Sequence, residues 1–372
     1  MRGAQDKRNR PIAVILTALF VVFTFLFYVF FQRDLIALMQ ETWSRGQTIN
    51  NPLVTAMIAA LVLFLSQRLV KGFTRFAGRW EAFTWLPSYL LLGFSTSVDS
   101  HTMHYDLVPW AAVLGGCLLV LLVVGWLRRF WPPDKRASFL SLLLPGIVVT
   151  IISMVICMVL TNHDAALHQE LAAWRYAARG DAGRVAAVGR RSLETTPSLT
   201  ALRNVALAHE GRIGDELFTY PQPYGVDGLD VSRYTRQNTQ FGAKVFYDFL
   251  GHEPYGGENA SAFFARLYRQ DDSPLHRDLY AASLLLEGRL ADFVQAFPPP
   301  SSSLTSVLSP RHWREAWLLC RDLTSYEDEE LQPLLDDFLT TLRTSHTNRQ
   351  ATLNALYLTY GQTYWYYYYS RQ

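Results

Sequence analysis

The feature that most constrains this chain is a series of long apolar segments in its first 160 residues. A helix needs about 20 apolar residues to cross roughly 30 Å of hydrocarbon. We expect five spans, at about residues 11–31, 48–66, 80–98, 107–127 and 139–160. The first is also compatible with a cleaved signal peptide, because basic residues precede it, but its length and the lack of a small-x-small cleavage site favour a retained span.

Basic residues predict how these spans are oriented, because Lys and Arg collect in cytoplasmic loops close to helix ends. The third segment is the least apolar, since it contains Pro87, Ser88 and Gly93. If it crosses, the basic N-terminus shares the cytoplasmic side with two further clusters, Arg68, Lys71, Arg75 and Arg79, and Arg128, Arg129, Lys135 and Arg136. Five crossings then place the chain after residue 161 outside the cytoplasm.

The chain is expected to consist of a transmembrane domain at 1–161 and an extracytoplasmic helical domain at 162–372. The first contains 14 Lys and Arg against 7 Asp and Glu, whereas the second contains 20 against 25. Because the second part is mildly acidic and has no basic stripe, nucleic acid is not an expected partner. We expect no buried Asp, Glu, Lys or Arg within the spans, which disfavours a pump or a channel.

Helical periodicity continues after the last span. Apolar residues between 164 and 179 have helical spacing, Gly180 interrupts them, and a second helix is expected from about 182 to 194, before Pro197. This pair resembles a tetratricopeptide repeat, in which a small residue such as Ala173 and a closing proline occupy fixed positions. The similar turn glycines Gly180, Gly211 and Gly288 are 31 and 77 residues apart, so the array departs from the 34-residue period.

Further features are the turns at Tyr220-Pro221 and Leu250-Gly251 and the aromatic end at 364–369. With these, the chain resembles an uncharacterised family of Gram-negative inner-membrane proteins that have several spans and a tetratricopeptide-like tail. The resemblance brings no established activity. The expected fold class is all-α, an N-terminal bundle of five transmembrane helices followed by a helical-hairpin solenoid. The alternative is that the tail helices form a compact cap.

The loop between the third and fourth spans contains the candidate catalytic residues, Asp99, His101, His104 and Asp106. Imidazole and carboxylate groups are suited to ligating a divalent metal or transferring protons. However, the spacing does not match a helical His-x-x-x-His zinc motif, and a polar outer loop contains such residues in any case. The acidic run at 327–330 lacks the ligand spacing of a calcium loop and is interpreted as an exposed helix N-terminus. We predict no metal site and no cofactor.

Two turn-rich inserts, at 220–228 and 251–257, interrupt the array. Loops are exposed and often contain recognition residues, although most loops of this kind are connectors. The candidate binding residues in these inserts are Tyr220, Tyr224, His252 and Tyr255. The aromatic end at 364–369 is compatible with an interfacial anchor, but we favour packing against the array, because loose termini seldom expose so much aromatic area.

Two functions from different classes fit these features. The first is a non-enzymatic membrane scaffold or adaptor whose extracytoplasmic helical domain binds an envelope protein or peptide, since stacked hairpins present a concave surface. The second is a membrane enzyme or accessory subunit that acts on a lipid-linked glycan or another envelope substrate through His101 and His104. We favour the first, because no established catalytic motif accompanies the helical pattern. The lipid bilayer is a partner in both cases, and no feature predicts an oligomeric state.

Overall fold

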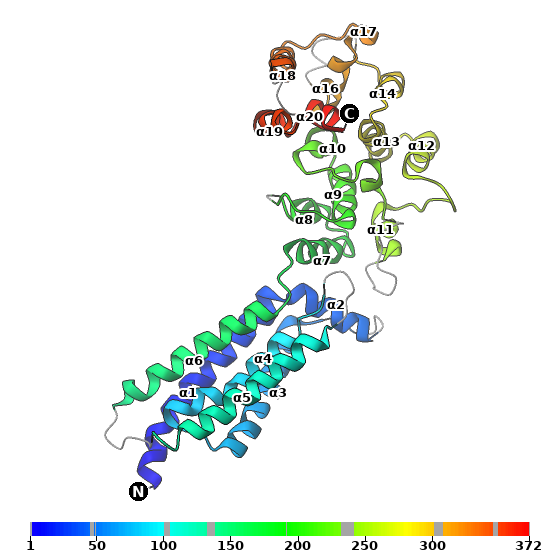
Figure 1. Cartoon of the computed structure of the whole chain (residues 1–372). Coiled ribbons are helices and arrows are strands. Elements are labelled where there is room, and N and C mark those ends of the chain that lie inside the picture. The colour runs from blue at the N-terminus through cyan, green and yellow to red at the C-terminus, as the bar shows by residue number, and fades with distance from the viewer. Residues whose placement is uncertain are drawn as a thin grey trace. The chain divides into compact units, whose positions relative to one another are not determined.

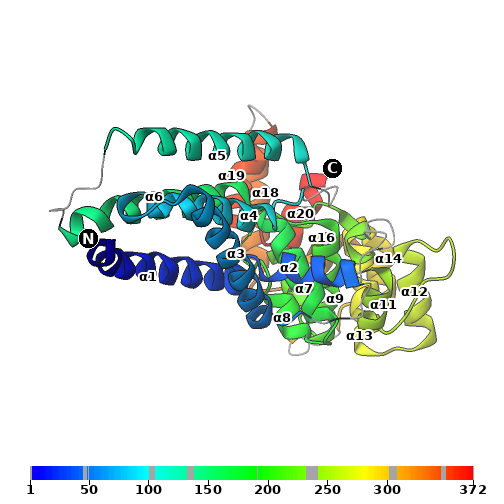
Figure 2. The same cartoon turned by 90° about the horizontal axis from the view of Figure 1, so that it is seen from below.

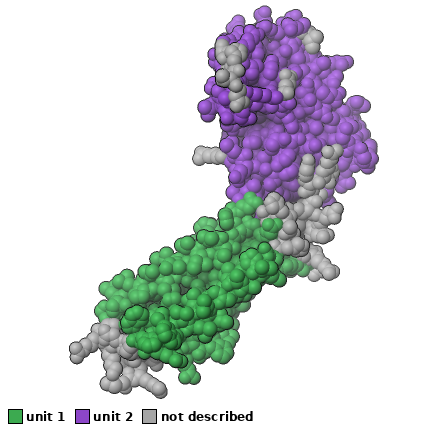
Figure 3. All heavy atoms as spheres, in the orientation of Figure 1, with its two compact units in different colours: residues 1–164 green, residues 165–372 purple. Residues whose placement is uncertain are grey.

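The computed structural model describes residues 2–44, 48, 50–99, 105–131, 138–190, 192–231, 242–300, 308–344 and 349–371. Throughout these ranges the regular structure is helical, apart from one isolated antiparallel bridge between Val98 and Tyr105. The predicted all-α class is therefore confirmed. The chain divides into two compact units, Met1–Asp164 and Ala165–Gln372 (Figure 3).

The N-terminal unit is built from long apolar helices and shorter connecting helices (Figure 1). Its elements are α1 (Arg2–Leu26), the π-helical turn η1 (Phe27–Phe31), α2 (Arg33–Ser44), α3 (Pro52–Thr74), the 3-10 helix η2 (Gly78–Trp85), α4 (Leu86–Phe94), α5 (Leu107–Leu127) and α6 (Phe139–Leu160). Side-chain oxygens of Asn51, Asp106 and Ser138 accept backbone N–H groups at the starts of α3, α5 and α6. These caps determine where the three helices begin.

Four helical segments among the described residues are long and apolar enough to cross a membrane: Arg10–Phe31, Pro52–Thr74, Leu107–Leu127 and Phe139–Leu160. They overlap the first, second, fourth and fifth expected spans, and their length and composition indicate a membrane-associated protein. The second begins later than residue 48, because Asn51 caps it and Pro52 occupies its first turn.

The third expected span, 80–98, is not one continuous α-helix. The eight-residue 3-10 helix η2 is followed by the nine-residue α4, which has Pro87 in its first turn. With rises of about 2.0 Å and 1.5 Å per residue, the two extend about 16 Å and 14 Å, which together equal the hydrocarbon thickness of about 30 Å. A pair of shorter helices can therefore supply the length of one span.

The segment formed by η2 and α4 runs parallel to α6. Near the start of both, a Cβ placed on Gly146 would lie 3.8 Å from the Cβ of Ala82. Gly93 comes eleven residues after Ala82, and Cys157 comes eleven residues after Gly146. A Cβ on Gly93 would lie 3.2 Å from the carbonyl oxygen of Cys157. Because both pairs are separated by the same number of residues, the segment follows α6 in the same direction.

The ends of these two segments are joined by hydrogen bonds. The backbone N–H of Asn162 donates to the carbonyl oxygen of Thr96 (3.0 Å), and its side-chain amide donates to the carbonyl oxygen of Val98 (2.6 Å). The hydroxyl groups of Thr96 and Thr161 are also hydrogen-bonded. The segment therefore ends level with the end of α6.

α1 also runs parallel to α6, and the two lie side by side (Figure 1, Figure 2). The Cδ1 atom of Leu16 lies 3.6 Å from the Cβ position of Gly146. Sixteen residues later, Gln32 donates its side-chain amide to the carbonyl oxygen of Asn162 (2.8 Å). α1, the η2–α4 segment and α6 therefore share one direction.

α3 and α5 run in the opposite direction. Ser88 Oγ of α4 donates to the carbonyl oxygen of Leu63 of α3 (2.9 Å). Gln67, which comes later in α3, donates to Oγ1 of Thr84, which comes earlier in the η2–α4 segment (2.8 Å), so the two run antiparallel. Near the start of α5 the ring of Trp110 contacts that of Phe94 at the end of α4, with 5.1 Å between the centroids, and beyond the end of α5 Arg128 Nη1 donates to the carbonyl oxygen of Thr74 (2.7 Å). Consecutive long segments of the N-terminal unit thus alternate in direction.

The C-terminal unit contains one large hydrophobic core surrounded by short helices. They are α7 (Ala165–Ala177), α8 (Ala182–Ala187), α9 (Pro197–His209), α10 (Ile213–Glu216), η3 (Leu217–Thr219), η4 (Gly225–Leu229), α11 (Ala243–Leu250), α12 (Ala260–Gln270), α13 (Pro274–Glu287), α14 (Leu290–Ala296), α16 (Arg311–Leu319), α17 (Arg321–Thr324), α18 (Gln332–Thr344), α19 (Arg349–Tyr360) and α20 (Tyr364–Arg371).

Three hairpins of this unit, α7–α8, α9–α10 and α13–α14, turn at Gly180, Gly211 and Gly288, whose φ angles are 69°, 67° and 71°. The left-handed backbone at these positions explains why glycine occupies each turn. The second helix of each hairpin has only 6, 4 or 7 residues, against 13, 13 and 14 in the first. Long and short helices therefore alternate in these three hairpins.

The expectation of a helix from 182 to 194 is wrong, because α8 ends at Ala187. Val188 adopts an extended conformation and Gly189 has a φ of 65°, neither of which continues an α-helix. The next helix, α9, begins where Thr196 caps the N–H of Leu199.

Two glycines within helices of the C-terminal unit are expected to respond in opposite ways to alanine. In α10, a Cβ on Gly214 would lie 2.5 Å from Cβ of Pro310, so Gly214→Ala should cost about 1–3 kcal/mol of stability through overpacking. In α8, the nearest atom to a Cβ on Gly183 is 3.8 Å away, so Gly183→Ala should stabilise by up to about 1 kcal/mol. Near-UV circular dichroism during thermal unfolding of the full chain in detergent measures both, and equal shifts would contradict this packing.

Candidate functional site

The loop at 251–258 connects α11 to α12 and is held in place by Arg266 of α12. Arg266 Nη2 donates to Oε2 of Glu258 (2.8 Å) and to the carbonyl oxygen of Glu253 (3.2 Å). Glu258 Oε2 in turn accepts the backbone N–H of Tyr255 (3.0 Å). The hydrogen bond from Arg266 lowers the pKa of Glu258, so the pair stays ionised at neutral pH.

This loop presents the ring of Tyr255 to its surroundings. Tyr255 is 65% exposed, yet its ring is stacked against Arg266, whose Cζ lies 3.9 Å from the ring centroid. The glycines Gly251 and Gly257 have φ angles of 88° and 83° and allow the turns on either side. An exposed ring whose position is fixed in advance loses little conformational entropy on binding, which is the property of a recognition residue.

His252 lies three residues before this tyrosine and pairs with His276 of α13, with 4.6 Å between the ring centroids. His276 is buried, and its Nδ1 lies 3.2 Å from the carbonyl oxygen of Asp271. Partial burial, His276 and Arg266 lower the pKa of His252, so its ring is neutral at neutral pH. In the described parts of the chain, no group of three His, Cys, Asp or Glu side chains has an arrangement that could hold a metal ion.

The first insert has a different environment. Tyr220 is only 4% exposed, and its hydroxyl donates to the carbonyl oxygen of Ala186 (3.1 Å). Arg203, itself buried, lies with Cζ 4.5 Å from the centre of this ring. Tyr224 is half-buried and donates to the carbonyl oxygen of Thr195 (3.1 Å). The expectation that this insert exposes its aromatic rings is therefore wrong for Tyr220, which belongs to the core.

The candidate catalytic residues of the outer loop are placed only in part, since His101 and His104 lie outside the described residues. Asp99 and Asp106 are both exposed. Asp106 accepts the backbone N–H of Val108 (3.1 Å) and thereby caps α5. This hydrogen bond gives Asp106 a structural role that requires no reaction.

The expectation of no buried charge within the spans is wrong at Glu81. This residue of η2 is only 2% exposed and forms an ion pair with Lys71 of α3. A carboxylate can be buried here because a cation from the neighbouring helix compensates it. The pair lies near the start of the 80–98 segment, beside the predicted cytoplasmic basic cluster, and not in the middle of the span.

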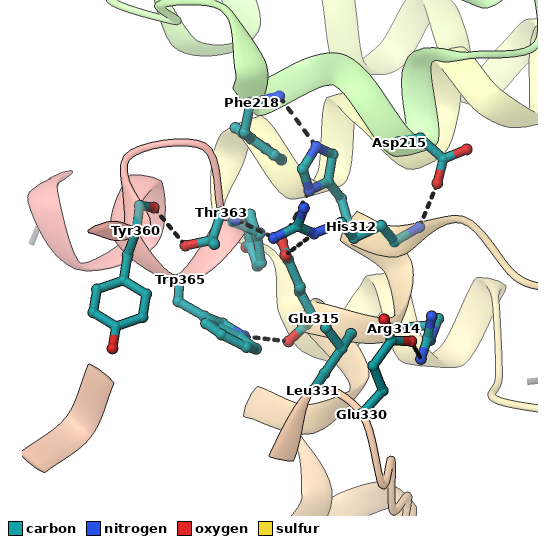
Figure 4. A network of polar contacts seen from close by, with 12 residues as sticks. Asp215, Phe218, His312, Arg314, Glu315, Glu330, Leu331, Tyr360, Thr363 and Trp365 are labelled. Atoms are coloured by element: carbon teal, nitrogen blue, oxygen red, sulfur yellow. Dashed lines mark hydrogen bonds and ion pairs between the residues drawn. The ribbon is translucent and has the colours of Figure 1, made fainter. Parts of the chain in front are cut away.

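A second polar network lies inside the C-terminal unit and is centred on the fully buried Glu315 of α16 (Figure 4). Its carboxylate accepts hydrogen bonds from His312 Nδ1 (2.8 Å), Arg311 Nε (2.9 Å) and the backbone N–H of Tyr364 (2.7 Å). Its carbonyl oxygen accepts the indole N–H of Trp365 (2.9 Å). One residue therefore attaches the aromatic helix α20 to α16.

His312 extends this network to η3. Its Nε2 accepts the backbone N–H of Phe218 (3.4 Å), so its Nδ1 has the proton that is donated to Glu315. An imidazole next to a carboxylate is also an acid–base arrangement, but both side chains are inaccessible here. The network is structural, and Trp365 and Tyr364 are fully buried, which confirms that the aromatic end packs against the helices.

The acidic run at 327–330 was interpreted from the sequence as an exposed helix N-terminus. This interpretation is wrong for one of its residues. Asp328 is buried and accepts two hydrogen bonds from Arg314 (2.8 Å and 2.9 Å). The hydroxyl of Tyr326 (2.8 Å) and the backbone N–H of Leu331 (3.0 Å) also donate to it. Burial by itself would raise the pKa of Asp328, but these hydrogen bonds outweigh burial and hold the pKa below its usual value.

Sequence reasoning missed the residues that organise these sites. The spacing of Arg311, His312 and Glu315 at i, i+1 and i+4 places both donors within reach of one carboxylate on a helix, which is a detectable signal. Glu258 and Arg266 are separated by eight residues across a turn and a helix start, so no periodicity relates them.

Part of the chain is similar to a known protein family. Residues 148–251 match the model of a family of unknown function, DUF6057. The matched segment runs from within α6 through α11 and covers less than half of the chain. No curated protein and no solved structure matches the chain.

Replacing Glu315 tests the buried network. In Glu315→Gln an amide N–H₂ group would face donors from His312, Arg311 or Tyr364, so we expect a loss of about 2–4 kcal/mol of stability. The exposed Glu329 provides the control, since Glu329→Gln should change stability by less than about 0.5 kcal/mol. Similar unfolding temperatures for the two variants would show that the buried network does not contribute to the stability of the folded protein.

The lowered pKa of Asp328 predicts that the protein loses folding stability in acid. Because its pKa is lower in the folded protein than in the unfolded chain, its contribution is complete above the usual value of about 4 and is lost as the pH falls through the folded value. Asp328→Asn should be less stable at pH 7 and lose less further stability on acidification, whereas the exposed Asp322→Asn should follow the wild type. Parallel pH profiles for all three proteins would contradict the assignment.

Proposed function

We propose that this protein is an integral membrane adaptor whose C-terminal helical unit binds a partner protein or peptide on the side of the membrane opposite the N-terminus. The membrane assignment is supported by the four long apolar segments of the N-terminal unit. The family resemblance implied by the sequence would place it in the inner membrane of a Gram-negative cell, with the C-terminal unit in the periplasm.

The arrangement of the long segments supports five crossings. With the η2–α4 segment parallel to α1 and α6, and with α3 and α5 reversed, each consecutive segment crosses in the direction opposite to the one before. The contact between Arg128 and Thr74 brings the two basic clusters next to each other, as expected if both lie on the cytoplasmic side. An odd number of crossings then separates the N-terminus from the C-terminal unit.

Helical hairpins support a binding role for that unit. The glycine turns repeat the same left-handed geometry three times, and stacked hairpins of a tetratricopeptide-like array provide surfaces for peptides and proteins. Nothing in the described part of the chain favours the enzymatic alternative, since Asp106 has the role of a helix cap.

The single observation that carries the proposal is the fixed, exposed ring of Tyr255. Tyrosines are frequent binding hot spots because they combine a large apolar area with a polar tip. Exposed carboxylates at this loop are Glu253, which belongs to it, and Asp271, which acts electrostatically on His252, and the C-terminal part of the chain has five more acidic than basic residues. A partner segment with basic side chains complements this surface.

Site-specific photo-crosslinking in the full-length protein tests the proposal. A photoreactive phenylalanine analogue in place of Tyr255 should give one discrete adduct, whereas the same analogue at Leu358, which is also highly exposed, should not. With the partner identified, Tyr255→Ala should weaken binding at least tenfold, as expected for a hot spot. Arg266→Met, which frees the loop, should weaken binding in the same direction.

The proposal fails if position 255 gives no adduct, or gives the same adducts as position 358. It also fails if the partner identified at position 255 binds Tyr255→Ala as tightly as the wild type.

A further inference from the structure

The N-terminal unit contains a cavity of about 500 Å³ between η1, α2, α3 and α4. One end of its lining lies at the level at which α3 begins and α4 ends, because Asn51 and Ser95 both contribute there. In the five-crossing arrangement this is the level of the outer leaflet. This end of the cavity therefore lies where the polar headgroups of the membrane meet its hydrocarbon.

The polarity of the lining changes along α3. Asn51 and Thr55 line the cavity at the start of the helix, whereas Ala59, Val62 and Leu63 line it further on. Twelve residues separate Asn51 from Leu63, and this corresponds to about 18 Å along the helix axis. The cavity is thus polar at the outer end and apolar toward the centre of the unit.

The wall of the cavity is open on the side that faces away from the bundle. Ile58, Val62 and Leu91 all line it, and each is more than one-third exposed. In a membrane, lipid chains and not water cover such surfaces. An empty space beside these side chains would lose dispersion contacts, so an acyl chain entering from the bilayer is the occupant that this opening accepts.

The polar end offers neutral hydrogen-bonding groups. Asn51 Oδ1 is used by the backbone N–H groups of Leu53 and Val54, which leaves the amide N–H₂ of Asn51 as the available donor. Gln40 of α2 lines the same end, and its amide donates to Thr48 (3.2 Å) with a second N–H remaining. No charged side chain occurs among the described residues of the lining.

We propose that this cavity is a binding site for one outer-leaflet phospholipid. One acyl chain lies along α3 from Thr55 toward Leu63, and the ester and phosphate oxygens accept hydrogen bonds from Asn51 and Gln40. The site rests on the membrane arrangement of the proposed function but not on its partner binding. A lipid bound in this site stays with the protein when the lipids that merely surround the helices are removed.

Native mass spectrometry of the full-length protein, released from nanodiscs of phosphatidylcholine and phosphatidylglycerol, tests the site. The wild type should retain one phospholipid after detergent washing. Ala59→Trp fills the cavity and should reduce retention at least tenfold, whereas Leu122→Trp, at an exposed position of α5, should leave it unchanged. Gln40→Leu preserves the apolar channel but removes a headgroup donor, so it should speed lipid loss several-fold.

Equal retention by the wild type, Ala59→Trp and Gln40→Leu would overturn the proposal, and so would equal loss from all variants, because only surrounding lipid would then be present. If Ala59→Trp does not fold, Gln40→Leu alone decides between the two results. Carbonate extraction of membranes separates this failure from that of the membrane assignment, since a protein released into the soluble fraction would refute the assignment itself.

Discussion

The packing of the η2–α4 segment against α6 is the constraint on which the arrangement of the N-terminal unit depends. Gly93 permits α4 to approach the backbone at Cys157, and hydrogen bonds from Asn162 to Thr96 and Val98 fix the ends of the two segments at the same level. A side chain larger than hydrogen at position 93 would meet a carbonyl oxygen at 3.2 Å. If this segment did not cross, the long helices would number four and both ends of the unit would share one side.

The polar groups of the N-terminal unit are distributed in a way that suits a bilayer. At one end Glu81 is paired with Lys71, and at the other Gln32 is paired with Asn162. Between the two ends, Gln67 donates to Thr84 Oγ1 and Ser88 Oγ donates to the carbonyl oxygen of Leu63. Because unmade hydrogen bonds are costly in hydrocarbon, these contacts between helices offset part of the cost of burying polar side chains there. The same logic appears inside the C-terminal unit, where Glu315 is buried only because three donors surround it.

The sequence was informative where one local property determines the structure. The four helical segments that are long and apolar enough to cross a membrane follow from apolar length, and the glycines at 180, 211 and 288 follow from the need for a left-handed turn. Hydropathy measures composition and not helix type, so it could not reveal that η2 is a 3-10 helix or that Glu81 is compensated by Lys71. The insert at 251–257 was identified from its turn residues, but the contacts that fix Tyr255 come from Arg266 on the next helix and follow no local pattern.

The most direct test of this account is the sidedness of two single cysteines in intact cells. The native cysteines Cys117, Cys157 and Cys320 are all buried, so they contribute little background to labelling by a membrane-impermeant maleimide. Leu193→Cys lies in the C-terminal unit and Trp131→Cys lies between α5 and α6, and both positions are exposed. We expect position 193 to react in intact cells and position 131 only after permeabilisation. The reverse pattern, with position 131 reacting in intact cells and position 193 only after permeabilisation, is what four crossings predict and would contradict the five-crossing arrangement.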